Sequence, residues 1–336
     1  MRIATFNTEN LGEGEASDEA DRRRIAILRP QLLRLEADVV CLQEVNAPRD
    51  PDGIRRLSLL DALLAGTPYA AFHRAASTRP GAGGPAGGPM DRHNLVVLSR
   101  WPISAQRQVF HDFVPPVPHA FLAGGAGAAG ADGAIRWDRP LLHVEIAVPG
   151  GRRLHVLDLH LRAPLAAPVP GQKTGPFAWA SVSGWAEGYF IASVKRSGQA
   201  LEARLLVERI LDAEPEALVV VAGDFNAETG EAPTRILLAD IEDTGNGALA
   251  GRSLVPLERS LPESQRFSVI HGGRRMMLDH LLASRPLLAL YRGLEIHNEA
   301  LGDELVARSG VRDSPESYHA PVVATFALPE TPEQPS

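Results

Sequence analysis

Seven polar side chains, of the kinds that bind metal ions and transfer protons, stand at or beside the ends of apolar segments. The clearest case is an apolar run at 218–222, which Asp224 and Asn226 follow closely. The run is typical of a strand buried on both faces. Alternate side chains of an extended chain leave the same face, so a carboxylate and an amide would point together. A structural alternative is a turn that Asp and Asn close through their own backbone hydrogen bonds. The other five side chains are Asn7, Glu44, His160, Asp279 and His319.

These residue types suit a particular chemistry. Carboxylate and amide oxygens are hard ligands, appropriate for Mg²⁺ or Mn²⁺. A histidine held by a carboxylate can act as a general acid or base, or donate a hydrogen bond to a phosphoryl oxygen. The absence of paired cysteines and of a His-Glu-x-x-His pattern argues against zinc. No serine lies in a nucleophile-elbow context, so acyl-enzyme chemistry has no candidate residue.

Apolar patterns place these side chains on strands that alternate with helices. Residues 2–11 predict a strand that carries Asn7, and residues 38–45 predict a buried strand with Glu44 near its end. Apolar residues recur at helical spacing over 18–35 and 197–213, which predicts two helices. The alternation indicates a layered α/β arrangement. Further strands are predicted over 94–103, 141–148, 154–161 and 276–282 and after His319.

Segments rich in glycine, alanine and proline interrupt this pattern. Strand patterns of the same kind continue on both sides of 79–89 and 123–133, so we interpret these tracts as insertions in one domain, residues 1–328. The segment 162–192 is expected to be a long loop near the site. Residues 329–336 are rich in proline and glutamate, and we expect a disordered tail there.

Composition limits the classes of function. A chain of 336 residues, 44% of them hydrophobic, can bury a sizeable core. The formal charge of −7 gives no bulk attraction to nucleic acid or anionic lipid, although an acidic enzyme can carry a local basic groove. The single cysteine, Cys41, excludes an intramolecular disulfide and fits a reducing compartment. The N-terminus lacks the apolar region of a signal peptide, and no apolar run has the length of a membrane span. We therefore expect a cytoplasmic monomer with no dedicated protein partner.

Seven motifs together resemble the endonuclease/exonuclease/phosphatase superfamily, the DNase I-like group of enzymes. Gly-Asp-x-Asn alone is a weak signal, but the seven motifs occur in the order typical of the family and extend over nearly the whole chain. They are Thr5-Phe-Asn-Thr-Glu-Asn-Leu11, Leu42-Gln-Glu-Val45, Asn94-Leu-Val-Val-Leu-Ser99, Leu157-Asp-Leu-His-Leu161, Gly223-Asp-Phe-Asn226, Leu278-Asp-His280 and Ser317-Tyr-His-Ala-Pro-Val322.

The resemblance implies a fold and a reaction. The fold is a four-layer α/β sandwich, in which two packed mixed β-sheets are flanked by helices and loops at one edge form the site. The reaction is hydrolysis of a phosphodiester or phosphomonoester by attack of water at phosphorus, as in an endonuclease or exonuclease. The cofactor is Mg²⁺ or Mn²⁺, which offsets charge on the transition state and the departing oxygen.

The resemblance also assigns metal and water ligands. Glu44 matches the principal metal ligand, with Asn7 beside it. Asp224 would activate or orient the attacking water, and Asn226 would help to hold the water and the phosphate.

The remaining roles implied by the resemblance concern the phosphate. His319 would contact the scissile phosphoryl group, positioned by a hydrogen bond to Asp279. His160 would bind a phosphate oxygen or assist the leaving group. Asn94 is a candidate for substrate binding. Arg162 is a second candidate, as a local basic residue and not through the resemblance, and it can equally be an ordinary solvated charge.

One position departs from the family pattern. The usual Ser-Asp-His is Ser-Tyr-His here, and Tyr318 replaces an aspartate that is commonly a second metal-site ligand. A phenol, with a pKa of about 10, is a poor Mg²⁺ ligand at neutral pH. The site could use one metal held mainly by Glu44, Asp279 or another carboxylate could compensate, or activity could be weak. The alternative function is thus a non-catalytic or weakly active binding module on the same fold. The class of phosphate-ester substrate stays open.

Overall fold

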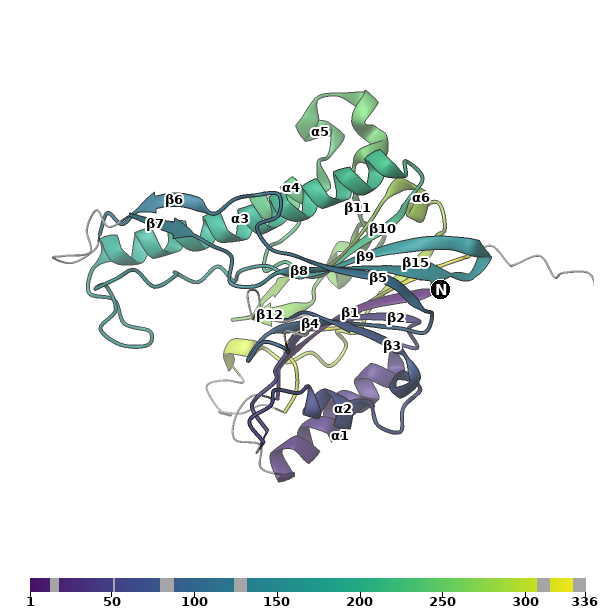
Figure 1. Ribbon diagram of the computed structural model, residues 1–336, viewed down its shortest axis with the longest axis horizontal. Coiled ribbons are helices and arrows are strands. Elements are labelled where there is room, and N and C mark those ends of the chain that lie inside the picture. Colours follow the sequence, from purple (N-terminus) through teal and green to yellow (C-terminus); the bar gives the residue numbers. More distant parts are fainter. Residues whose placement is uncertain (13–17, 51, 79–87, 124–131, 307–314, 329–336) are drawn as a thin grey trace, which may run out of the picture.

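Two six-stranded sheets lie face to face, and helices cover their outer faces, so the chain forms four layers (Figure 1). The structure is a computed structural model, and it describes residues 1–12, 18–50, 52–78, 88–123, 132–306 and 315–328. Both sheets combine parallel and antiparallel pairs, because β1 is parallel to β2 and β9 is parallel to β10 while their other neighbours are antiparallel. The first sheet has the order β15 (Tyr291–Ile296), β16 (Val322–Phe326), β1 (Arg2–Leu11), β2 (Val39–Val45), β4 (Asn94–Ser99), β3 (His73–Ala76). The second has the order β11 (Val255–Pro256), β14 (Asp279–Ala283), β10 (Leu218–Asp224), β9 (Arg152–His160), β8 (Leu141–Val148), β5 (Ile103–Val109).

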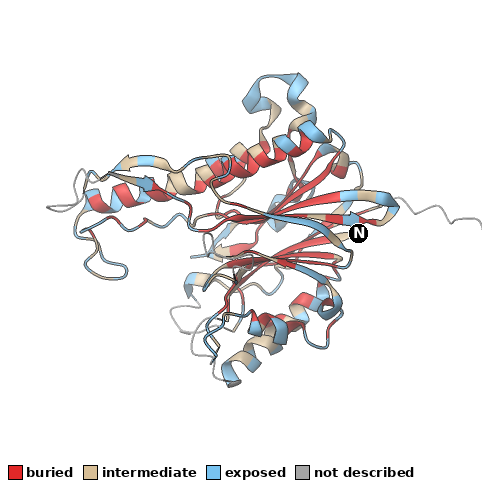
Figure 2. Cartoon of the chain, in the orientation of Figure 1, coloured by how far each residue is buried: buried red, intermediate tan, exposed pale blue. Residues whose placement is uncertain are grey.

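Strand periodicity divides the apolar side chains between three buried layers. Ile3 and Val39 pack in the core between the sheets, opposite Val156 and Val220 of the second sheet. On the outer face of the first sheet, apolar residues such as Phe6 pack under helices α1 (Asp18–Arg34) and α2 (Ser58–Leu64). Figure 2 shows these layers as continuous buried bands. Burial on both faces explains why the central strands are apolar at nearly every position.

The outer face of the second sheet packs against helix α3 (Val182–Ala213) and α4 (Ala232–Leu238). Leu157 and Val219 contact this layer, together with Leu206 of α3. A hairpin of β6 (Val117–Ala120) and β7 (Asp132–Ile135) runs beside the N-terminal half of α3 (Figure 1). The remaining elements are short: α5 (Ile241–Thr244), α6 (Arg285–Leu288), β12 (Val269–His271) and β13 (Arg274–Met276).

Helix α3 begins earlier than the sequence predicts. Its first residue is Val182, so the last part of the expected 162–192 loop is helical. Ser181 caps the helix by accepting a hydrogen bond from the backbone N–H of Gly184 at 3.0 Å. Glycine weakens the helical pattern of the sequence in this part. Gly188 is a glycine because the preceding chain packs against it: a Cβ there would lie 2.4 Å from the carbonyl oxygen of Ala167.

We propose that residues 1–328 form one domain. The amino group of Met1 donates to the carbonyl oxygen of Phe326 at 2.8 Å, so both ends of the described chain meet in the first sheet. Of the predicted insertions, residues 79–87 and 124–131 lie outside the described residues, as does the whole 329–336 tail. None of the described helices combines the length and hydropathy that crossing a bilayer requires.

A substitution at Gly223 tests whether the end of β10 must lie close to β9. Its φ is +140°, and a Cβ there would lie 1.8 Å from the carbonyl oxygen of Leu159. We expect Gly223→Ala to lower the free energy of unfolding by about 3 kcal/mol or more, measured by urea denaturation.

Gly230→Ala is the matched control. An added Cβ there meets nothing within 4 Å, so its effect should stay within about 0.5 kcal/mol. Equal stabilities of the two variants would contradict the close approach at Gly223.

Candidate active site

Strand register brings the predicted polar residues to one edge of the two sheets. Asp224, the last residue of β10, pairs with His160 at the end of the parallel strand β9 and with Asp279 at the start of the antiparallel strand β14. In the facing sheet, Asn7 and Glu44 lie near the ends of the parallel strands β1 and β2. Strand ends from both sheets therefore supply one cluster.

Asn7 joins the carboxylates of the two sheets. It is fully buried, and its Nδ2 donates to Glu44 Oε1 at 3.1 Å and to Asp224 Oδ2 at 3.0 Å. Its Oδ1 accepts the backbone N–H of Glu9 at 2.9 Å, which fixes the orientation of the amide. In this geometry Asn7 offers hydrogens to the site, whereas the sequence led us to expect an oxygen ligand beside the metal.

Glu44 is turned into the cluster by an irregular backbone. Its φ is +58°, and the pairing of β1 with β2 shifts register around it. Its Oε2 accepts the backbone N–H of Asn10 at 3.1 Å. Burial alone would raise the pKa of Glu44, but the charges of His93 and His319 and the hydrogen bond from Asn7 outweigh burial and lower it. Glu44 is thus held as a carboxylate.

Asp224 and Asn226 form both the turn and the cluster. The backbone N–H of Asn226 donates to Asp224 Oδ1 at 2.8 Å, and its Nδ2 donates to Oδ2 at 3.2 Å. The turn and the shared face, posed above as alternatives, occur together. Burial raises the pKa of Asp224 to about 7; His319 opposes this shift, and Asp279 adds to it.

His319 and Asp279 form a hydrogen-bonded pair, with 2.8 Å between Nδ1 and Oδ2. The other ring nitrogen of His319 lies 4.0 Å from Asp224 Oδ2. Burial lowers the pKa of His319, but the carboxylates of Asp279 and Asp224 outweigh burial and raise it well above its ordinary value. Asp279 Oδ1 is buried and has no hydrogen-bond partner among the described residues, so it is available to a cation.

Arg139 fixes the protonation of His160. The Arg139 guanidinium, which can only donate, contacts His160 Nδ1, so Nδ1 is the acceptor. The proton of the neutral ring is then on Nε2, 3.4 Å from Asp224 Oδ2 and 3.6 Å from Glu44 Oε1. Burial, followed by the charge of Arg139, lowers the pKa of His160 well below its ordinary value, which keeps the ring neutral.

Sequence reasoning missed two residues of the site, Arg139 and His93. Arg139 stands in an irregular segment before β8, where no pattern marks it. His93 Nε2 lies 3.0 Å from Asn10 Oδ1 and 3.9 Å from Glu44 Oε2, and burial followed by Arg139 lowers its pKa to about 4. Its only signal was its position directly before the Asn94 motif.

The two expected substrate-binding residues differ in their surroundings. Asn94 is fully buried: its Nδ2 donates to the carbonyl oxygens of Val45 and Met90 at 2.8 Å each, and its Oδ1 accepts the N–H of Met90 at 2.7 Å. In this geometry Asn94 holds a loop, and its part in substrate binding stays a prediction. Arg162 pairs with Asp138 at 3.3 Å and its charge acts on His160, so it remains next to the site.

Tyr318, at the position of the usual aspartate, is buried. Its ring lies beside Gly302, and its backbone N–H donates to Glu9 Oε2 at 2.7 Å.

The carboxylate oxygens of this cluster fit a divalent cation. Ligand atoms of Glu44, His160 and Asp224 lie within 4.8 Å of one another, and so do those of Asp224, Asp279 and His319. Two overlapping sets with three carboxylates suit a hard ion, and the orphaned Asp279 Oδ1 is a buried oxygen that an ion would satisfy.

Comparisons with known proteins bear on the family and the fold. A family model described as "Endonuclease/Exonuclease/phosphatase family" matches residues 4–309. An endonuclease/exonuclease/phosphatase family protein from Leptotrichia buccalis is 16% identical, with a TM-score of 0.54 over 98% of this chain and 100% of its own. Truncated TDP2 from Caenorhabditis elegans is 16% identical (TM-score 0.54, 97% of each chain), and an AP endonuclease from Archaeoglobus fulgidus is 14% identical (TM-score 0.53, 98% and 100%).

A search of curated protein sequences found no match. The structural likenesses, at this level of identity, bear on the fold alone. They confirm the predicted DNase I-like four-layer sandwich of two mixed sheets with flanking helices.

The His319–Asp279 pair gives a measurable pH effect in metal-free protein. Because Asp279 raises the pKa of His319, we expect Asp279→Asn to lower it, so that the ring loses its proton at a lower pH than in the wild type. Histidine-selective NMR titration measures this shift. The exposed Glu216→Gln should leave the titration unchanged, and the same His319 pKa in wild type and Asp279→Asn would refute the pairing.

Proposed function

The chain belongs to the endonuclease/exonuclease/phosphatase family, and from this premise we propose that it is a divalent-metal-dependent phosphoesterase. It would hydrolyse a phosphodiester or phosphomonoester by attack of water at phosphorus. The observation that carries the proposal is the meeting of Glu44, Asp224 and Asp279 with two histidines at one edge of both sheets.

Asp224 is the residue suited to accept a proton from the attacking water. Its pKa of about 7 lies near working pH, where a general base is most effective. The two hydrogen bonds from Asn226 hold its carboxylate in place, and Asn7 holds Oδ2 from the other sheet. The base is therefore oriented before substrate binds.

The two histidines would act on the phosphate in different protonation states. His319 carries a raised pKa and a second ring proton, so its Nε2–H can donate to a phosphoryl oxygen while Asp279 holds Nδ1. His160 is neutral and directs Nε2–H into the same space. Arg139 and Arg162 add positive charge that favours a phosphate group.

Glu44 would be the principal ligand of a Mg²⁺ or Mn²⁺ ion, with Asp224 and Asp279 as the nearest further carboxylates. When bound, the ion would offset negative charge on the transition state and on the departing oxygen. Because Tyr318 replaces an aspartate and a phenol is a poor ligand for these ions, we favour one ion held mainly by Glu44.

We expect Glu44→Ala and His319→Ala each to lower metal-dependent hydrolysis of bis-p-nitrophenyl phosphate by about 100-fold or more. The first removes the main anionic ligand, and the second removes a donor to the phosphoryl group. Release of p-nitrophenol with Mg²⁺ or Mn²⁺, and its loss on adding EDTA, measures the effect.

Glu216→Ala and His73→Ala change the same residue types at exposed positions and should retain full turnover. Unchanged turnover in Glu44→Ala or His319→Ala would refute the site. A wild-type protein that binds Mn²⁺ but hydrolyses none of DNA, RNA, nucleotides, inositol phosphates and sphingomyelin would favour the binding module instead. The same screen identifies the substrate class of an active protein.

A further inference from the structure

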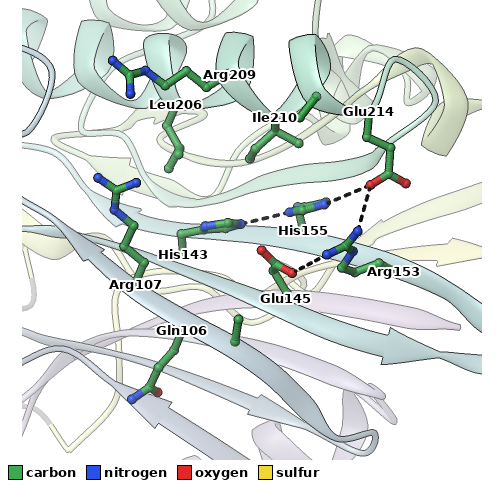
Figure 3. Close-up of a pocket in the computed structure, with 12 residues that line it drawn as sticks. Gln106, Arg107, His143, Glu145, Arg153, His155, Leu206, Arg209, Ile210 and Glu214 are labelled. Atoms are coloured by element: carbon green, nitrogen blue, oxygen red, sulfur yellow. Dashed lines mark hydrogen bonds and ion pairs between the residues drawn. The ribbon is translucent and has the colours of Figure 1, made fainter.

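A second cluster of metal-binding side chains lies on the outer face of the second sheet, under helix α3 (Figure 3). His143 and Glu145 are two residues apart on β8, and His155 faces Glu145 from β9. Ligand atoms of the three residues all lie within 4.8 Å of one another. They line a pocket of about 310 Å³ that Leu206 and Ile210 of α3 cover on one side.

This cluster is separate from the candidate active site. His155 precedes His160 by five residues on β9, a distance of about 16 Å in an extended strand. The two side chains also leave opposite faces of the sheet, since their positions along the strand differ by an odd number. His155 points to the helix layer, as Leu157 and Leu159 do.

The two histidines have the geometry of neighbouring ligands. His143 Nε2 and His155 Nδ1 are 3.1 Å apart, and their rings are stacked with an interplanar angle of 14°. Two nitrogens bound to one tetrahedral ion at about 2.0–2.1 Å lie about 3.3 Å apart, so little movement is needed. Both histidines are at least nine-tenths buried, and His155 Nε2 has no hydrogen-bond partner in the described part of the chain.

Both rings are available as neutral ligands at neutral pH. Burial, and then the neighbouring His155, lowers the pKa of His143 to about 4, and burial also lowers the pKa of His155. Neutral imidazole is the form that binds a metal ion. One of the two facing nitrogens carries the hydrogen of their 3.1 Å hydrogen bond, and this hydrogen would move to the other nitrogen of its ring when a metal ion binds.

Each of the three arginines that line the pocket contacts another side chain. Arg153 bonds Glu145 Oε2 at 2.9 Å and Glu214 Oε2 at 3.5 Å, and Glu214 Oε2 lies 3.7 Å from His155 Nε2 (Figure 3). Two carboxylates thus share one arginine. Two more arginines line the pocket: Arg107 is paired with Asp112 at 2.6 Å, and the Arg209 guanidinium lies 4.3 Å from the ring centroid of Phe113.

We propose that His143, Glu145 and His155 form a binding site for a transition-metal ion of the Zn²⁺ class, apart from the candidate active site. Imidazole nitrogens suit Zn²⁺ and its neighbours better than Mg²⁺, and two histidines with one carboxylate are a known zinc ligand set. Glu214, directly after α3, lies 3.7 Å from the other ring nitrogen of His155, Nε2.

The test is calorimetric titration of chelator-stripped full-length protein with Zn²⁺ in excess Mg²⁺. Wild type and Glu44→Gln should both bind one equivalent, because this site does not involve Glu44. His155→Asn and Glu145→Gln should each weaken that equivalent by about 10- to 100-fold. The exposed His73→Asn is the matched control and should bind as the wild type does.

Three results would overturn the proposal. They are wild-type Zn²⁺ affinity in Glu145→Gln, loss of the equivalent in Glu44→Gln alone, and binding of inorganic phosphate that His155→Asn abolishes. Glu145 is only partly buried, so Glu145→Gln decides the question if the more buried His155→Asn fails to fold, as judged by its circular dichroism. Because binding is the readout, failure here is distinguishable from failure of the phosphoesterase proposal.

Discussion

A single buried amide, that of Asn7, holds a carboxylate from each sheet. Its two hydrogens go to Glu44 and Asp224, which belong to strands that face each other across the core. Two buried carboxylates this close repel each other, and each loses hydration. The amide offsets part of this cost only while both sheets keep their register, so the chemistry of the site depends on the packing of the sandwich.

Polar contacts behind the site support the same alignment. Gln43 of β2 donates to Asp158 Oδ1 of β9 at 2.7 Å and bonds Thr5 of β1, so a second bridge joins the sheets. Burial raises the pKa of Asp158 well above its ordinary value, because the charged carboxylate loses hydration there. Gly223 lets β10 approach β9 closely at the same level. Strands thus carry Asn7, Glu44, His160, Asp224 and Asp279, which favours precise orientation of these groups, whereas His319, Asn226 and Arg139 lie in connecting segments.

Sequence patterns predicted the features of the site that short stretches of the chain determine. The apolar run before Asp224 identified a core strand, and the spacing to Asn226 identified a shared face that is also a turn. The family order of motifs then related Glu44 and His319 to that strand. These features are encoded within a few residues, or within a strand and its neighbour.

Features that depend on tertiary contacts were not predictable. The partner of Arg139 is a histidine 21 residues away, and the direction of the Asn7 amide is set by the backbone of Glu9. The partners of Asn94 are also backbone groups that no local pattern indicates. Likewise His143 and Glu145 share a face by strand periodicity, but only the register of β8 with β9 adds His155.

Anomalous diffraction from crystals grown with Mn²⁺ tests the central claim most directly, namely that both sheets build one hard-metal site. The account predicts an anomalous peak at about 2.1 Å from a carboxylate oxygen of Glu44, bordered by Asp224 and Asp279. A peak elsewhere, with none beside Glu44, would contradict it.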